Sequence, residues 1–231
     1  MSSDAQADEA LARLANIDAS TVSDALDRLS IEGWIEGLTR QTAGKIAGRA
    51  MTVQLGPPQP PDPPSPPRHL ASAAIDCADP RSVIVVAGGR VDAGGWGGLL
   101  TRAAVRNGVR GVVVDGAARD IDEASALGFP VFARACTPRT ARSRQQEVST
   151  NHPVRIGRVE VRPGDVVIAD GDGVVVIPAG RADEVSRIAA EISAAERRMA
   201  ERIGLGDQLA SVLDARYEHM LGSPSHARPA E

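Results

Sequence analysis

Three short apolar runs in the middle of the chain constrain its fold more than any other feature. They are residues 82–87 (SVIVVA), 111–115 (GVVVD) and 130–135 (PVFARA). Each has the length and apolar character of a buried strand. Residues 99–107 have helical spacing that stops at Gly108, and residues 120–127 predict a second helix that Gly128 closes. Strands and helices therefore alternate, which predicts an α/β core.

The N-terminal part is expected to add two short helices and one strand. One helix is predicted over residues 11–17 and another over 25–29, because residues 20–24 (STVSD) offer capping side chains ahead of the second. Residues 46–55 are typical of a strand, with Gly48 as a candidate bulge.

A proline-rich segment follows this strand. Residues 56–67 contain eight prolines, which exclude a helix or a central strand. Core-like sequence continues on both sides, so we interpret the segment as an extended surface loop rather than a linker between domains. A docking peptide is the alternative.

The last third of the chain changes to short strands and then to helices. The strands are predicted over residues 155–161, 166–170 and 173–177. The helices are predicted over 181–199 and 207–220. The expected organisation is one domain over 9–180, a helical extension over 181–220, and disordered tails at 1–8 and 221–231.

Charge and hydropathy exclude several classes of function. The formal net charge is −4, so no basic excess favours nucleic acid as a partner. No apolar run approaches the roughly 20 residues that cross a bilayer, and the N-terminus lacks a secretion signal. Cys77 and Cys136 lie far apart and match no redox or metal motif. A cytoplasmic protein without a membrane partner is the expectation.

The chain has a single lysine, Lys45, among 26 basic residues. A GC-rich genome would explain this bias, but it also limits the chemistry. A lysine that forms a Schiff base needs a desolvated pocket, and the sequence around Lys45 (AGKIAG) predicts none. If the protein cleaves a bond next to a carbonyl group, a metal ion is therefore the expected electron sink.

Glycines precede the helix predicted at residue 99. The backbone N–H groups of Gly98, Leu99 and Leu100 would have no partner within that helix and could bind a carboxylate or phosphate. A tight turn without a ligand is the alternative.

Arg119 and Asp120 follow the strand predicted at 111–115. Ligands of open α/β sheets collect beyond the carboxyl ends of strands. The guanidinium of Arg119 matches a carboxylate, and Asp120 can bind a hard cation. The alternative is that Asp120 caps the next helix while Arg119 makes a surface ion pair.

A nearby basic run is expected to be a solvated or intersubunit surface, with anion binding as the alternative; its members are Arg134, Arg139, Arg142 and Arg144.

These motifs together resemble the RraA-like family (regulator of RNase E activity A), which includes divalent-metal-dependent 4-hydroxy-4-methyl-2-oxoglutarate aldolases. The matching segments are residues 21–26, 96–101 (WGGLLT), 108–116 (GVRGVVVDG), 119–120, 126–133, 161–165 and 172–178. The resemblance implies an α/β fold of the swivelling β/β/α type, with a C-terminal helical extension and a trimeric or hexameric assembly.

The resemblance also implies a site for a small 2-oxo acid. Pyruvate would bind on the loop of Gly97 and Gly98, with its carboxylate on the amides of Leu99 and Leu100 and on Arg119. Asp120 would hold Mg²⁺ or Mn²⁺. Cleavage of the C3–C4 bond leaves negative charge on the 2-oxo oxygen, which the metal ion neutralises, whether a ketone or carbon dioxide departs.

Gly98 departs from the family's pattern. Many aldolases of the family carry an acidic residue there for proton transfer, and a retro-aldol step needs a base that decarboxylation does not. Asp122, Glu123 and Glu196 are the candidate replacements, Glu196 through a neighbouring subunit. The alternative for each is a solvated charge on a helix.

We therefore expect a metal-dependent lyase that releases pyruvate, as a 4-hydroxy-4-methyl-2-oxoglutarate aldolase, an oxaloacetate decarboxylase or both. The alternative is a non-enzymatic, protein-binding regulator of the RNase E type, which the presence of Asp120 disfavours. A methyltransferase is rejected because the sequence lacks the glycine motif that binds a methyl-donor nucleotide.

Overall fold

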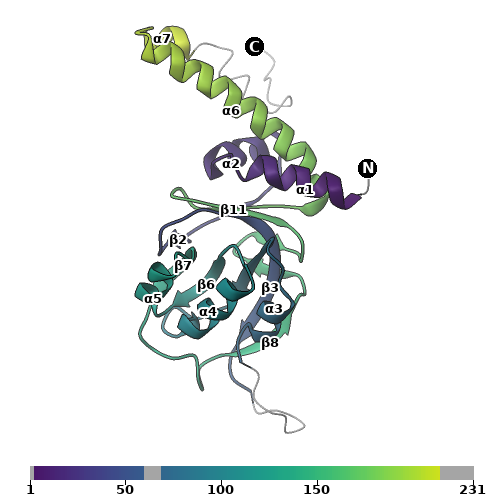
Figure 1. Ribbon diagram of the computed structural model, residues 1–231, viewed down its shortest axis with the longest axis vertical. Coiled ribbons are helices and arrows are strands. Elements are labelled where there is room, and N and C mark those ends of the chain that lie inside the picture. Colours follow the sequence, from purple (N-terminus) through teal and green to yellow (C-terminus); the bar gives the residue numbers. More distant parts are fainter. Residues whose placement is uncertain (1–2, 60–68, 214–231) are drawn as a thin grey trace, which may run out of the picture.

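The structure is a computed structural model, and it describes residues 3–59 and 69–213 (Figure 1). The strands are β1 (Trp34–Ile35), β2 (Thr39–Arg40), β3 (Ile46–Gly56), β4 (Ser82–Ala87), β5 (Gly94–Trp96), β6 (Val112–Ala118), β7 (Val131–Cys136), β8 (Gln146–Thr150), β9 (Val154–Ile156), β10 (Val159–Val161), β11 (Val166–Ala169) and β12 (Val174–Ile177). The helices are α1 (Ser3–Leu14), α2 (Ala19–Arg28), α3 (Ser72–Cys77), α4 (Gly98–Arg106), α5 (Ile121–Ala126), α6 (Ala182–Gly204) and α7 (Leu209–Val212), with a 3-10 turn, η1 (Ala179–Arg181).

The main sheet has the order β1-β12-β11-β3-β4-β6-β7-β2. Its centre, β3-β4-β6-β7, is parallel, and the α/β core expected from the alternating pattern is confirmed. The long strand β3 joins two parts of the sheet, because its first residues pair antiparallel with β11 and its later ones parallel with β4. The chain thus forms two β layers that share one strand.

Two groups of helices cover the outer faces of these layers. Apolar side chains of α1, α2 and α6 pack on β11 and β12, whereas those of α3, α4 and α5 pack on β4, β6 and β7. A third cluster fills the space between the layers, including Val85, Val113, Val167 and Val176. Figure 1 shows α6 beside α1 and α2, with α4 and α5 further along the molecule. This arrangement agrees with the expected β/β/α layering and C-terminal helix.

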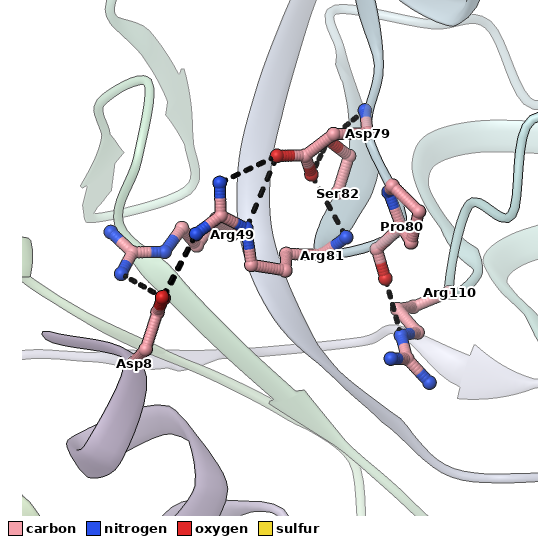
Figure 2. A network of polar contacts seen from close by, with 7 residues as sticks. All are labelled: Asp8, Arg49, Asp79, Pro80, Arg81, Ser82 and Arg110. Carbon is pink, nitrogen blue, oxygen red and sulfur yellow. Dashed lines mark hydrogen bonds and ion pairs between the residues drawn. The ribbon is translucent and has the colours of Figure 1, made fainter. Parts of the chain in front are cut away.

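The N-terminal segment differs from the prediction. Helix α1 begins at Ser3, so disorder over residues 1–8 is wrong for residues 3–8. The carboxylate of Asp8 pairs with Arg49 at 2.9 Å and with Arg81 at 3.0 Å, which fixes α1 against the sheet (Figure 2). These partners lie more than 40 residues away, where no local pattern reveals them.

Three further local features differ from the prediction. Helix α2 begins at Ala19, because Asp18 accepts the N–H of Thr21 at 2.7 Å and caps the helix before the expected residues 20–24. Gly48 pairs in register with Val167 and forms no bulge. The strand predicted over 155–161 is a hairpin of β9 and β10.

Several predicted segments lie partly or wholly outside the described residues. They are the greater part of the proline-rich loop, the end of the helix predicted over 207–220, and the tail at 221–231. Within the described chain no helix is both long and apolar enough to cross a membrane.

Candidate functional site

Arg119 and Asp120 lie directly after β6, the strand that pairs with β4 and β7 in the parallel centre of the sheet. Asp120 has a left-handed backbone (φ 58°), which is uncommon for a residue with a side chain. It occupies the N-cap position of α5, yet its side chain makes no capping hydrogen bond there. Instead, its Oδ2 atom accepts the backbone N–H of Gly98, at the start of α4, at 2.9 Å. The Asp120 side chain therefore does not cap α5 as the alternative expected, whereas the surface ion pair expected of Arg119 is present, with Asp120 as its partner.

Strand β5 holds the start of α4 beside Arg119. Trp96 pairs with Ala118, and the N–H of Arg119 donates to the carbonyl of Trp96 at 3.0 Å. The Trp96 ring is buried, stacks on Phe129 with a centroid distance of 6.0 Å, and donates from Nε1 to Thr101 at 2.9 Å. A buried aromatic ring thus fixes the glycine loop to the helix that follows it.

Two glycines make room for the Arg119 side chain. A Cβ atom on Gly94 would lie 2.9 Å from Cγ and Cδ of Arg119. A Cβ atom on Gly97 would lie 3.1 Å from Cγ of Arg119 and 3.0 Å from Oδ2 of Asp120. The Arg119 stem therefore crosses Gly94 of β5 and Gly97 after it at van der Waals distance, and side chains at these positions would displace it.

The first turn of α4 offers donors for an anion. Gly98 uses its N–H for Asp120, whereas the amides of Leu99 and Leu100 have no acceptor within the helix because they belong to its first turn. The Leu99 side chain is 85% exposed, so this turn lies at the surface. The structure thus brings together Arg119, Asp120 and the expected backbone amides.

Glu123 also belongs to this group. Its carboxylate forms an ion pair with Arg102, and a Cβ atom on Gly98 would collide with Glu123 Oε2. The Glu123 carboxylate therefore occupies the space that a side chain at position 98 would fill. Asp122, the neighbouring candidate, has an exposed side chain in the first turn of α5.

Glu196 lies elsewhere within one chain. It is on α6, where its Oε2 accepts a hydrogen bond from the hydroxyl of Thr21 on α2 at 3.2 Å. The pKa of nearby Asp24 is raised by burial first and by the charge of Glu196 second. A single chain therefore does not bring Glu196 to Arg119 and Asp120, which are at the α4 and α5 end of the sheet.

The donor set around Asp120 fits a cation that keeps most of its own water. Arg119 and Asp120 are each about one third exposed, at 35% and 37%, and their Nε and Oδ2 atoms are 3.2 Å apart. Among the described residues, no three His, Cys, Asp or Glu side chains are grouped so that they could hold a metal ion. Mg²⁺ needs few protein ligands, because it retains water and binds substrate oxygens, so one carboxylate beside open surface is compatible with it.

Two surface hollows of about 370 and 400 Å³ are lined by Trp34 of β1 and by residues of α2, and residues of β12 also line the first of them. Neither is lined by Arg119 or Asp120. The Arg119 and Asp120 side chains themselves are partly exposed on the single chain.

Sequence reasoning missed Gln145, which organises the glycine loop. This buried side chain accepts the N–H of Arg90 at 3.1 Å and donates to the carbonyl of Ala93 at 3.4 Å. An isolated glutamine has no motif, so only the contact reveals its role.

Comparison with known proteins identifies relatives along most of the chain. DlpA of Legionella pneumophila is 35% identical over 201 residues, which are 86% of this chain and 32% of that protein. The chain thus spans about a third of DlpA. A Halalkalibacterium halodurans protein, named provisionally as a 4-hydroxy-4-methyl-2-oxoglutarate aldolase, is 34% identical over 194 residues, 81% of this chain and 87% of that one.

Structural similarity agrees with the sequence matches. The crystal structure of Streptomyces coelicolor RraAS2, described as an unusual member of the RNase ES inhibitor RraA protein family, has a TM-score of 0.72 and 30% identity, covering 86% of this chain and 96% of that one. The sequence model of the RraA-like family (Aldolase/RraA) matches residues 19–176, which include Arg119, Asp120 and Glu123. The chain belongs to the RraA-like family.

Proposed function

We propose that this protein is a divalent-metal-dependent lyase that cleaves a carbon–carbon bond of a small 2-oxo acid and releases pyruvate. The observation that carries the proposal is the hydrogen bond between the Asp120 carboxylate and the Gly98 amide. It gathers a carboxylate, a guanidinium and the unpartnered first-turn amides of one helix at a single surface site. Such a set suits an acid that carries a carboxylate and a neighbouring carbonyl oxygen.

The chain's own residues have separable tasks in this proposal. The amides of Leu99 and Leu100 and the guanidinium of Arg119 bind the substrate carboxylate, because aligned N–H donors and a planar cation both favour it. Asp120 would hold Mg²⁺ or Mn²⁺, and such an ion supplies a Lewis acid that stabilises negative charge on the 2-oxo oxygen. Gly97 and Gly98 leave the space that substrate and Arg119 share.

Glu123 is the proposed proton acceptor for a retro-aldol reaction. A 4-hydroxy-2-oxo acid must lose its hydroxyl proton as the C3–C4 bond breaks, and a carboxylate within reach can accept it. The Glu123 carboxylate lies where a side chain at position 98 would project, so it substitutes for the acid that Gly98 lacks. Oxaloacetate loses carbon dioxide and has no such proton, so decarboxylation does not require this group.

The lysine alternative has no support from the contacts. Lys45, the chain's single lysine, is 61% exposed and pairs with Asp170 at 3.7 Å. An exposed ammonium group held in an ion pair lacks the desolvated pocket that a Schiff-base lysine needs.

A contribution from Glu196 requires a second copy of the chain, because within one chain Glu196 contacts Thr21 on α2. We therefore propose a trimeric or hexameric assembly in which α6 reaches a neighbouring site. A closed ring with head-to-tail contacts can bring different surfaces of two copies together.

The decisive experiment is a coupled assay of pyruvate release from oxaloacetate and from 4-hydroxy-4-methyl-2-oxoglutarate, with Mg²⁺ or Mn²⁺ and with a chelator. We expect turnover that the chelator abolishes and added metal restores. Lys45→Gln should retain turnover, and borohydride should not inactivate the protein in the presence of substrate. Turnover of neither substrate, or turnover insensitive to the chelator, would overturn the proposal.

The similarity to RraAS2 supports a second candidate, a non-enzymatic regulator that binds an endoribonuclease of the RNase E type. This second candidate would be favoured if the Asp120→Ala variant inhibits such a nuclease as strongly as the unaltered protein does, and if the unaltered protein releases no pyruvate.

A further inference from the structure

The parallel centre of the sheet carries a charged pair that the proposed chemistry does not use. Asp115 is the one charged residue of β6, and its side chain is only 18% exposed. Its Oδ1 atom forms an ion pair with Nε of Arg134 on β7, and its Oδ2 atom accepts the N–H of Gly88 at 3.3 Å. Because Gly88 directly follows β4, one carboxylate joins the end of that strand to β6 and β7.

Arg134 is held from a second direction as well. Its Nη1 atom donates to the carbonyl of Glu36, between β1 and β2, at 3.0 Å. Gly37 leaves room for this contact, since a Cβ atom there would lie 2.7 Å from Nη1. Arg134 thus has two partners within the chain and holds the Asp115 carboxylate in place, whereas Arg142 of the same basic run is exposed.

The N–H that Asp115 binds belongs to the first residue of the glycine loop, which comprises residues 88–97 between β4 and α4. Gly88 has a left-handed backbone (φ 70°), and a Cβ atom there would lie 2.6 Å from the carbonyl oxygen of Leu55. This tight turn therefore requires glycine. The Asp115 carboxylate fixes the backbone at the point where the chain leaves β4 and the loop begins.

The glycine loop connects this charged pair to the proposed substrate site. Along β6, the N–H of Ala117 donates to the carbonyl of Arg90 at 2.9 Å, and the N–H of Arg119 donates to the carbonyl of Trp96 at 3.0 Å. Both contacts join backbone to backbone, so the carboxylate adds a side-chain contact at the start of a loop that follows β6. The loop ends at Gly97, beside the Arg119 stem.

We propose that Asp115, held by Arg134, is a positioning residue that keeps the glycine loop in the conformation that binds the substrate carboxylate. This inference rests on the proposed 2-oxo acid site. Without the ion pair the loop would populate other conformations, and the substrate would bind only the competent one. The apparent affinity then falls in proportion to the competent fraction, whereas turnover of the bound substrate is unchanged. A residue that only stabilises the fold would lower the melting temperature and leave the affinity unchanged.

Asp115→Asn tests the inference, because asparagine has one acceptor oxygen and cannot accept from both Gly88 and Arg134 as aspartate does. The dissociation constant of pyruvate is measured by calorimetry with Mg²⁺, well below the melting temperature, and KM and kcat for oxaloacetate are measured in the coupled assay. We expect the dissociation constant and KM to rise about tenfold, the equivalent of one hydrogen bond to a charged group, and kcat to stay within about twofold. The control Arg142→Gln should bind and react like the unaltered protein.

A rescue variant and a measurement on the loop itself complete the test. Asp115→Asn combined with Arg134→Gln pairs an amide donor with an amide acceptor and leaves the asparagine oxygen for Gly88, so it should recover most of the lost pyruvate affinity. Hydrogen exchange of residues 88–97 should be faster in Asp115→Asn than in the unaltered protein, and should slow again in the double variant.

The inference is overturned if Asp115→Asn binds pyruvate as tightly as the unaltered protein, if its affinity falls without faster exchange in the glycine loop, if the double variant recovers nothing, or if the unaltered protein binds no pyruvate. Failure of the lyase proposal is a different result. A protein whose pyruvate affinity depends on Asp115, but which turns over neither substrate, would retain the positioned site and lose the reaction. A protein in which Asp115→Asn leaves KM for oxaloacetate unchanged would retain the reaction alone.

Discussion

The Oδ2 atom of Asp120 accepts the backbone N–H of Gly98 at 2.9 Å, although the two residues are 22 positions apart. This hydrogen bond joins the end of β6 to the start of α4. It orients the carboxylate away from α5, whose N-cap position Asp120 occupies, and toward the amides of α4, and it leaves Oδ1 beside Arg119. One contact therefore sets the relative positions of the groups proposed to bind the 2-oxo acid.

Two substitutions separate the structural and chemical tasks of Asp120. Asp120→Asn keeps an oxygen that can accept the Gly98 N–H, but it removes the negative charge that a divalent cation needs. We expect metal-dependent pyruvate release to fall by about 100-fold or more, while the melting temperature stays within about 2 °C of the unaltered protein. Asp120→Ala should lose activity equally and also lower the melting temperature, because the Gly98 amide loses its partner. An Asn variant with near-normal kinetics would remove Asp120 from the proposed metal site.

Gly97→Ala tests the space beneath Arg119. Its backbone is extended (φ −164°), so alanine causes no backbone strain, but the new methyl group would contact Asp120 and Arg119 at about 3 Å. We expect KM for the 2-oxo acid to rise about tenfold with little change in thermal stability. Gly180→Ala is the matched control, since nothing lies within 4 Å of a Cβ atom there. Equal kinetics for the two variants would show that Arg119 does not need this clearance.

The sequence and the structure agree best where the signal is local. The buried strands β4 and β6, the helix that stops before Gly108, and the position of Arg119 and Asp120 after a strand all follow from apolar runs and glycines. The partner of the Asp120 carboxylate could not be predicted in this way, because Gly98 is 22 positions away in the sequence and contributes only its backbone N–H.

Short strands and contacts between distant residues could not be predicted from the sequence pattern either. Strand β5 contains Gly94, Gly95 and Trp96, a composition with low strand propensity, and it forms because β6 provides pairing partners. The choice between Asp122 and Glu123 depends on which of them faces Gly98, and the pattern of a single helical turn does not decide it. Glu196 stays a prediction, since only an assembly can test it.

Glu123→Gln distinguishes the two lyase reactions. Removal of the proton acceptor should slow pyruvate release from 4-hydroxy-4-methyl-2-oxoglutarate by about 100-fold or more, whereas oxaloacetate decarboxylation should change only a few-fold. The ratio of kcat/KM for the two substrates is the measurement. Arg102→Gln is the control, because it removes the ion-pair partner of Glu123 and keeps the carboxylate. Parallel loss of both reactions in Glu123→Gln would mean that the residue has a structural role.

The ion pairs of Asp8 should make the attachment of α1 to the sheet weaker in acid. Hydrogen bonds from Arg49 and then Arg81 hold the pKa of Asp8 below its ordinary value of 3.8 (Figure 2). When folding lowers the pKa of a carboxyl group, the ionised group stabilises the folded state. This contribution is fully present above the pKa of the unfolded state, and it is lost as the pH falls through the lower pKa of the folded state. Asp8→Asn should therefore melt a few degrees below the unaltered protein at about pH 7, and the difference should vanish near pH 2. Asp76→Asn, at an exposed position on α3, should show no difference at either pH.

Mixed assemblies test whether Glu196 acts on a neighbouring copy. Asp120→Asn and Glu196→Gln would each inactivate every site of a homogeneous ring if the two residues complete one site from different copies. Unfolding and refolding the two variants together should then restore part of the activity, because some sites in a mixed ring receive an intact Asp120 from one copy and an intact Glu196 from the next. Pyruvate release after mixing, compared with each variant refolded alone, is the measurement, and light scattering must find the same mass for all three samples. Activity that stays at the level of the separate variants, or a monomeric mass, would confine Glu196 to its contact with Thr21 in its own chain.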